Sequence, residues 1–213
     1  MNAMPERPAT YAIVCWLLPL AMSIALSALA AAHDTLPGDT ELASWIQGLA
    51  LPGDTLADAL RSITFTQFVV AAGVALAALL WLRGHRREAA VFAASLIILL
   101  LLQAGIKEIV DRPRPSPEEL EIRGSFSSPS FPSGHVMSGT FLYGFLAYAA
   151  FLFPLPAAAR VSLAGASCAV IAASGPANVW LGVHWPSDVA GGYAWGAVVL
   201  LAAVFACERW RQR

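Results

Sequence analysis

Residues 89–107 read AAVFAASLIILLLLQAGIK, an apolar run that ends on the only lysine of the chain. A helix needs about 20 apolar residues to cross the hydrocarbon core of a bilayer, and this run approaches that length. Similar runs cover residues 10–32, 64–82, 136–154, 160–177 and 189–207. Because the bilayer core offers backbone groups no water, a chain crosses it as helices or as a closed barrel. The sequence therefore predicts an all-α, polytopic membrane helix bundle with six transmembrane helices.

The composition indicates one membrane-embedded domain. Of the 213 residues, 58% are hydrophobic and 13% are charged, and the six runs leave little chain for a soluble domain. We therefore expect a single integral-membrane domain over residues 1–213, with the lipid bilayer as its partner. A net charge of −1 gives no indication of a nucleic-acid partner, and the sequence leaves the oligomeric state open.

The distribution of positive charges predicts the orientation. Cytoplasmic loops of membrane proteins are enriched in Arg and Lys. With both termini in the cytoplasm, the inner segments carry eight cations, among them Arg83, Arg86 and Arg87 after the second run. The outer segments carry five, and four of these lie within residues 107–123. This orientation places that stretch, and the polar segments 130–135 and 182–188, on the outer face of the membrane.

The first apolar run has two interpretations. Arg7, the apolar stretch and the small residues Ala30 to Ala32 fit either a first transmembrane helix or a signal peptide with its cleavage site. The apolar stretch is longer than the roughly 7 to 15 residues of a signal peptide, which favours a retained helix.

A pentapeptide occurs twice between the first two runs, as LPGDT at residues 36–40 and 51–55. Each Pro-Gly-Asp indicates a turn whose Asp or Thr caps a following short helix. Trp45, Ile46 and Leu49 give one such helix an apolar face. We therefore expect residues 33–63 to form an outer-face loop with a short interfacial helix. An ordinary amphipathic loop is favoured over a role in substrate entry.

The first polar segment follows the third run. Lys107 lies in the last turn of a helix that is expected to continue to about Val110, and Pro113 and Pro115 then break the helix. The prolines carry Arg112 and Arg114 over the end of the bundle in an extended arm. These cations either bind an anion at the membrane surface or extend towards lipid head groups as ordinary helix-end residues.

The second polar segment, Ser130-Phe131-Pro132-Ser133-Gly134-His135, directly precedes the fourth run. Free backbone amides at a helix N-terminus, together with the Ser133 hydroxyl, form an anion site, and Gly134 leaves that site uncovered. His135 then projects from the first turn beside a bound anion. The alternative is a histidine that only caps the helix at the interface.

The third polar segment, Gly182 to Asp188, precedes the sixth run. His184 lies just outside the predicted helix and Asp188 lies in its first turn, so the carboxylate can accept a hydrogen bond from one ring nitrogen. That bond would fix the tautomer and leave the other nitrogen free for nucleophilic attack. Structural networks also use such pairs, so the pair alone does not decide between the two roles.

Together, the three segments resemble the signature of the type-2 phosphatidic acid phosphatase superfamily. This family includes membrane lipid phosphatases, polyprenyl diphosphate phosphatases, glucose-6-phosphatases and soluble vanadium haloperoxidases. Its pattern is Lys, six residues, Arg-Pro; then Pro-Ser-Gly-His; then Ser-Arg, five residues, His, three residues, Asp. The chain matches with Lys107 and Arg114-Pro115, with residues 132–135, and with His184 and Asp188.

The third motif departs from the family pattern, because Ala177 and Asn178 stand at the Ser-Arg positions. A phosphate-binding arginine is therefore missing, at a cost of roughly ten- to a hundredfold in binding unless it is replaced. We expect Asn178 to donate neutral hydrogen bonds, and Arg112 or Arg123 to reach into the site in its place.

The resemblance implies a mechanism. His184 would attack phosphorus in line to form a phosphohistidine, with Asp188 orienting its ring, while His135 would protonate the leaving oxygen and then activate water. No metal or other cofactor is required. The groups that would hold the phosphoryl oxygens are Lys107, Arg114, Ser133 and the amide of Gly134.

The function that the resemblance implies is a membrane lipid phosphatase acting at the outer leaflet of a bacterial inner membrane, with its site facing the periplasm. Polyprenyl diphosphate, phosphatidic acid and phosphatidylglycerophosphate are all candidate substrates. Three alternatives remain: a phosphotransferase that uses the same phosphohistidine, a non-catalytic lipid-phosphate binding or transport protein, and a metal site built from His135, His184 and Asp188.

Overall fold

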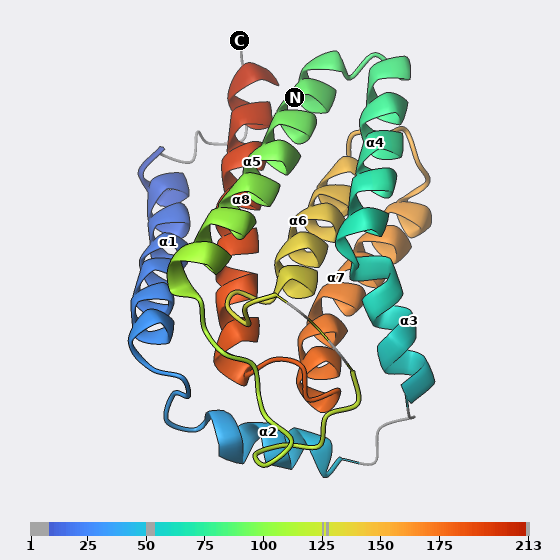
Figure 1. Cartoon of the computed structure of the whole chain (residues 1–213). Helices are drawn as coiled ribbons and strands as arrows, with labels where there is room; N and C mark the ends of the chain where they lie inside the picture. The colour runs from blue at the N-terminus through green and yellow to red at the C-terminus, as the bar shows by residue number, and fades with distance from the viewer. Residues whose placement is uncertain (1–8, 50–53, 125, 127, 212–213) are drawn as a thin grey trace.

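A computed structural model describes residues 9–49, 54–124, 126 and 128–211, and these residues form an all-helical bundle (Figure 1). No strand occurs among the described residues. The helices are α1 (Ala9–Ala32), α2 (Asp39–Gln47), α3 (Asp54–Thr64), α4 (Thr66–Leu82), α5 (Arg86–Val110), α6 (Gly134–Ala149), α7 (Ala157–Trp180) and α8 (Pro186–Arg211).

Each of the six predicted runs contains one helix, but six membrane crossings are not confirmed. By length and composition, α1 from Val14, α5, α7 and α8 can each span a membrane, and α3 with α4 counts as a fifth span if this bent pair is one unit. The 16 residues of α6 make a helix of only about 24 Å at 1.5 Å per residue. It ends at Ala149 rather than at residue 154, because Pro154 and Pro156 disfavour helical backbone before them.

Helix α6 can be short because protein, rather than lipid, surrounds most of it. Its first turns are buried throughout, and it packs against α8, α7, α4 and α5. In the largest core cluster, the Phe92 ring of α5 stacks on Phe141 and lies tilted against Phe145, both of α6. Helix α1 packs on the outside against α8, where the Trp16 indole donates to the carbonyl of Val198. Helix α6, whose first turn carries His135, is therefore held from several sides.

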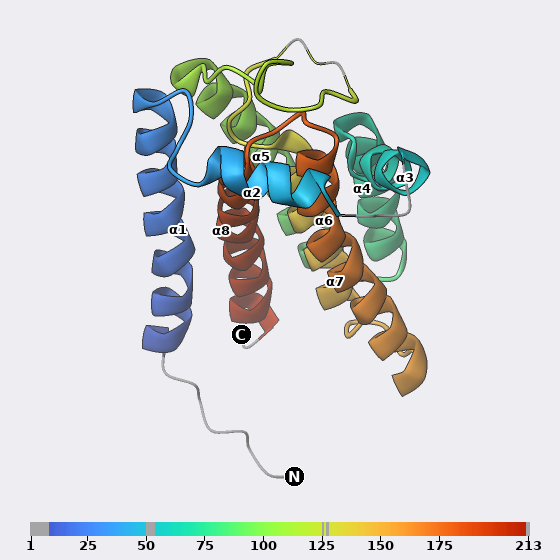
Figure 2. The same ribbon diagram turned by 90° about the horizontal axis from the view of Figure 1, so that it is seen from below.

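Two short helices lie at one end of the bundle. Figure 2 shows α2 running across that end, and α3 meets α4 at a bend of 52°. A short helix, α2, is thus present in the predicted loop, with Ala43 and Ile46 buried against the bundle and Trp45 exposed, and its place at the membrane interface stays a prediction. Residues 51–53 of the second pentapeptide lie outside the described residues, and α3 begins at its Asp54.

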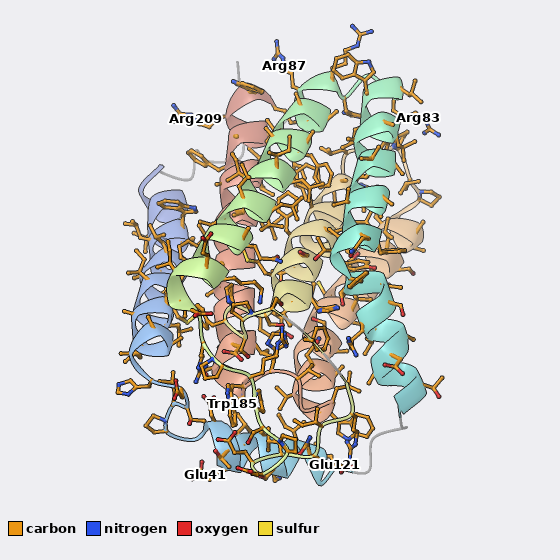
Figure 3. The ribbon with its side chains drawn as sticks, in the orientation of Figure 1. Glu41, Arg83, Arg87, Glu121, Trp185 and Arg209 are labelled. Carbon is orange, nitrogen blue, oxygen red and sulfur yellow. The ribbon has the colours of Figure 1, made fainter. Side chains whose placement is uncertain are left out.

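The two ends of the bundle differ in charge. Figure 3 shows Arg83, Arg87 and Arg209 at one end, and Glu41, Glu121 and Trp185 at the end that α2 covers. In Figure 1, α1 begins and α8 ends at the arginine-bearing end. The polar segments and the arginine-rich loops therefore lie at opposite ends, as the charge pattern of the sequence predicts.

Candidate active site

The three polar segments meet at the end of the bundle that α2 covers (Figure 1). His184 lies in the turn between α7 and α8 and is buried. Its Nδ1 lies 3.5 Å from Oδ2 of Asp188, and its Nε2 lies 3.4 Å from Nη1 of Arg114. One ring nitrogen thus faces a carboxylate while the other faces a guanidinium.

The turn that carries His184 requires a glycine at position 182. Gly182 has a φ of 68°, a backbone conformation that side chains with a Cβ rarely adopt. A Cβ atom there would also lie 2.2 Å from the carbonyl oxygen of Glu121. Only because this position has no side chain can the turn place His184 beside Arg114, in the segment that follows α5.

Asp188 is fixed by several hydrogen bonds in the first turn of α8. Its Oδ1 accepts from Nη1 of Arg112 at 2.7 Å, and its Oδ2 accepts from the backbone N–H of Trp185 at 2.9 Å and from the Ser130 hydroxyl. A carboxylate held in this way orients the imidazole and favours the tautomer with the proton on Nδ1. The lone pair of His184 is then on Nε2.

Burial lowers the pKa of the His184 imidazole to about 4, with Asp188 opposing this shift and the positive charge of Arg114 adding to it. The ring is therefore neutral at neutral pH. A neutral imidazole with its lone pair on Nε2 has the form that a nucleophile requires.

Arg112 joins the His184–Asp188 pair to α2. Its Nη2 donates to Oδ2 of Asp39 at 2.9 Å, and Asp39 also accepts from the N–H of Ser187 at 2.9 Å. Both charged side chains are buried. The sequence predicts that Asp or Thr caps α2, but Gly38 occupies the cap position and Asp39 instead binds Arg112 and Ser187. The first Pro-Gly-Asp turn therefore supports the start of α8.

We expect Asp39→Ala to destabilise the protein by about 3 kcal/mol, because it removes one partner of a buried ion pair and leaves the Arg112 guanidinium partly uncompensated. The measurement is the thermal unfolding midpoint in detergent. Glu41→Ala is the matched control, since Glu41 lies in the same turn of α2 but is exposed. Equal midpoints for the two variants would contradict this account of Asp39.

His135 lies in the first turn of α6 with its ring between aromatic neighbours. Ring centroids of Phe65 and Phe126 lie 5.7 and 5.9 Å from that of His135. Among the described residues, neither Nε2 of His135 nor the hydroxyl of Ser133 has a hydrogen-bond partner, although both atoms are buried. Buried polar atoms normally have partners, so these two are available to a polar ligand.

Gly134, between them, also packs closely against α5. A Cβ at this position would lie 2.8 Å from Nε2 of Gln103 on α5. The glycine therefore lets the Gln103 side chain approach the start of α6, while the helix N-terminus still presents backbone N–H groups without intrahelical partners.

Lys107 and Arg114 approach the same region from α5 and from the arm that follows it. The Lys107 ammonium donates to the carbonyl of Pro129, and Nε of Arg114 donates to the carbonyl of Ser128 at 2.8 Å. Nη1 of Arg114 also donates to the carbonyl of Val183. Neither cation forms a salt bridge with a carboxylate in the part of the chain that the structure describes. Both cations therefore keep their charge available to an anion.

The metal-site alternative does not fit this geometry. In residues 9–49, 54–124, 126 and 128–211, no three His, Cys, Asp or Glu side chains are grouped as metal ligands. Both carboxylate oxygens of Asp188 are engaged by Arg112, Ser130 and the Trp185 backbone. The two histidines and Asp188 therefore do not present the proposed set of ligands.

A family comparison matches the part of the chain that contains all three polar segments. The model of the PAP2 superfamily matches residues 88–213, which is more than half of the chain. The chain belongs to the PAP2 superfamily. This confirms the motif resemblance, since PAP2 is the type-2 phosphatidic acid phosphatase superfamily.

Two relatives extend the comparison. Phosphatidylglycerophosphatase B of Bacillus subtilis (strain 168) is 36% identical over 104 residues, which cover 46% of this chain. The match covers 48% of that protein, so the chain spans about half the length of this curated relative. A crystal structure of a transmembrane PAP2-type phosphatidylglycerolphosphate phosphatase from Bacillus subtilis aligns with a TM-score of 0.77 at 22% identity, over 90% of this chain and 96% of that one. The fold is therefore a transmembrane PAP2 fold, and the chain is an integral membrane protein.

The third PAP2 motif lacks its arginine, and Asn178 does not occupy the anion site in its place. Asn178 is buried in the last turns of α7, where its Nδ2 donates to the carbonyl of Ser174 at 2.8 Å. One of its two side-chain N–H bonds is thus used within its own helix. The expectation that Asn178 donates to a bound anion has no support in this geometry.

The two arginines expected to compensate are also engaged elsewhere. Arg112 binds Asp188 and Asp39 through its two terminal nitrogens. Arg123 lies over the Trp180 ring and bonds to Glu121 and to the Trp180 carbonyl. The sequence predicts that one of the two reaches into the site. Instead, the buried carboxylates of Asp39 and Asp188 bind Arg112, and Glu121 and Trp180 bind Arg123.

Arg61 on α3 is the cation near the PAP2 site that the sequence did not indicate as a functional residue. Its guanidinium carbon lies 4.5 Å from the centroid of the Phe126 ring, and that of Arg114 lies 4.4 Å from the same centroid. Phe126 in turn lies beside His135 and His184. Arg61 precedes the matched residues 88–213, so the family pattern could not identify it.

Proposed function

We propose that this PAP2 protein is a lipid phosphatase that removes a phosphate or diphosphate from a lipid headgroup at the outer leaflet, through a phosphohistidine on His184. The observation that carries the proposal is the environment of His184. Nδ1 faces the carboxylate of Asp188, while Nε2 faces Arg114. A phosphoryl group beside Nε2 would meet a nucleophile and a cation together.

In the first step, the Nε2 lone pair forms a bond to phosphorus as the bond from phosphorus to the lipid oxygen breaks. With the phosphate dianion bound beside it, His135 is protonated, and it gives its proton to that oxygen as the lipid alcohol leaves. Asp188 stabilises the positive charge that develops on the His184 ring. The unpartnered Nε2 of His135 is the ring atom available for this transfer.

In the second step, His135 takes a proton from water as the water oxygen attacks phosphorus. The bond between phosphorus and Nε2 of His184 breaks, inorganic phosphate leaves, and the ring returns to its neutral form. His135 therefore ends the cycle protonated and His184 ends it free. All atoms that this cycle consumes come from the lipid phosphate and one water molecule.

The remaining polar groups would stabilise the charge on the phosphoryl oxygens. Lys107 and Arg114 contribute full positive charges, and the Ser133 hydroxyl and the backbone N–H groups at the start of α6 contribute hydrogen bonds. Phosphoryl transfer depends mainly on such positioning and charge stabilisation. These groups converge from α5, the arm and α6, which explains why the three motifs must meet.

We expect Lys107→Ala to reduce phosphate release by about ten- to a hundredfold, because a charged hydrogen-bond donor is lost from the phosphoryl oxygens. Phosphate release from detergent-solubilised lipid phosphate is the measurement, with and without a chelator. The wild type should remain active in chelator. Unchanged turnover in Lys107→Ala would remove Lys107 from the site.

The substrate class follows from the membrane setting and from the relatives. The site lies at the end of the bundle opposite Arg83, Arg87 and Arg209 (Figure 3). We assign the end that carries the site to the periplasmic side of a bacterial inner membrane. The two relatives are named for phosphatidylglycerophosphate, which makes this lipid the first to test. A phosphate-release screen over phosphatidylglycerophosphate, phosphatidic acid and undecaprenyl diphosphate identifies the substrate. No release from any of them would contradict the proposed activity.

A further inference from the structure

We infer that Arg61 supplies the guanidinium that the third motif lacks, and that it binds the same phosphoryl group from α3 instead of α7. This inference rests on the proposed function and adds a residue to it. Asn178 replaces an arginine in sequence, whereas Arg61 replaces it in space. The three cations around the phosphate would then be Lys107, Arg114 and Arg61.

The guanidinium of Arg61 lies close to the residues of the site. A Cβ built on Gly124 would lie 3.2 Å from Nη1 of Arg61 and 3.0 Å from Cγ1 of Val183. The guanidinium of Arg61 and the side chain of Val183, which precedes His184, therefore both lie next to Gly124. The guanidinium carbons of Arg61 and Arg114 lie 4.5 and 4.4 Å from the centroid of the Phe126 ring. The same ring therefore contacts both cations.

The positive charge of Arg61 has little compensating negative charge near it. The Arg61 side chain is 20% exposed, and its one salt bridge is a 3.9 Å contact with Asp58, whose side chain is 63% exposed. Its buried Nε has no hydrogen-bond partner among the described residues. A largely buried cation is costly unless it is paired and hydrogen-bonded, and a solvated carboxylate at this distance does little. A phosphoryl oxygen would satisfy this group.

Arg61 and Arg114 are two positive charges close to each other. The pKa of Arg114 falls to about 10, chiefly through burial, and the positive charge of Arg61 acts in the same direction. Two guanidinium groups that share one aromatic ring repel each other, and an anion bound by both would offset this repulsion. Phe126 thus contacts both guanidinium groups, and a planar guanidinium is well suited to phosphate recognition.

Arg61 reaches the site from the last turn of α3. Helix α3 is bent by 52° from α4 and packs against α7 and α6. Thr64, at the end of the same turn, packs against Gly139 of α6. The replacement cation therefore comes from a helix that precedes the motifs in the sequence.

The test compares Arg61→Gln, Arg61→Lys and Asp58→Asn with the wild type. Inorganic phosphate, used as a competitive inhibitor of lipid phosphate hydrolysis, is the probe for the anion site. We expect Arg61→Gln to weaken inhibition by phosphate and to lower kcat/KM by about ten- to a hundredfold. Arg61→Lys should keep part of both, because it retains the charge but not the planar donors. Asp58→Asn should leave both unchanged.

Two results would overturn the role of Arg61. One is an unchanged inhibition constant for phosphate in Arg61→Gln. The other is an equal loss in Asp58→Asn, which would show that the ion pair only supports α3. The unfolding midpoint in detergent is measured for each variant, and Arg61→Lys carries the comparison if Arg61→Gln does not fold. A wild type that releases no phosphate would instead contradict the proposed function, so the two failures are distinguishable.

Discussion

His184→Ala should lower phosphate release by at least about a thousandfold, because it removes the atom that attacks phosphorus and no neighbouring group can replace it. Nε2 of His184 is the ring atom beside Arg114, and the buried turn holds the ring in place. The measurement is steady-state phosphate release from the lipid that the wild type hydrolyses. An unchanged inhibition constant for inorganic phosphate would show that the anion site survives the substitution.

The matched control is His33→Ala. His33 is exposed at the end of α1, on the same side of the bundle as the site. It should retain wild-type turnover. Substantial turnover in His184→Ala, with His33→Ala as a reference, would show that His184 is not the nucleophile and that a different group attacks phosphorus.

His135→Gln should lower lipid phosphate hydrolysis by about 10²- to 10⁴-fold, the range for loss of general acid–base catalysis. The two steps should respond differently to the substrate. A p-nitrophenyl leaving group needs no proton, so the first step should survive while the second step, which needs water activated by His135, remains slow. We therefore expect an initial burst of nitrophenolate followed by slow turnover.

His85→Gln is the control for this prediction, since His85 packs edge-on against Phe153 at the other end of the bundle. It should leave both phases unchanged. A His135→Gln variant that hydrolyses the lipid and the nitrophenyl ester at equally reduced rates, without a burst, would contradict the assignment of His135 to both proton transfers.

The helices and the three motif segments could be predicted from the sequence because each is a local pattern. The run that ends at Lys107 was predicted to continue as helix to about Val110, and α5 ends at Val110. The extended arm after it follows from Pro113 and Pro115, and the approach of His184 to Asp188 follows from a separation of four residues. Each of these depends on backbone geometry over a few residues, which composition and proline positions determine.

The parts that could not be predicted depend on contacts between distant segments. Asp39 and Arg112 are 73 residues apart, and only the folded bundle shows that a loop carboxylate holds the arginine expected to bind phosphate. Arg61 precedes the motifs, and its placement depends on the bend between α3 and α4 and on Phe126. A local pattern records which cations are present but not which carboxylate, ring or carbonyl holds each of them.

The measurement that tests the central claim most directly is mass spectrometry of the peptide that contains His184, taken from His135→Gln quenched in alkali during turnover of p-nitrophenyl phosphate. The account predicts one phosphoryl group on His184, stable in alkali and lost in acid, at a level that matches the nitrophenolate burst. The same adduct should be absent when His184→Ala is combined with His135→Gln. A burst without an adduct on His184, or an adduct on another residue, would contradict the phosphohistidine mechanism.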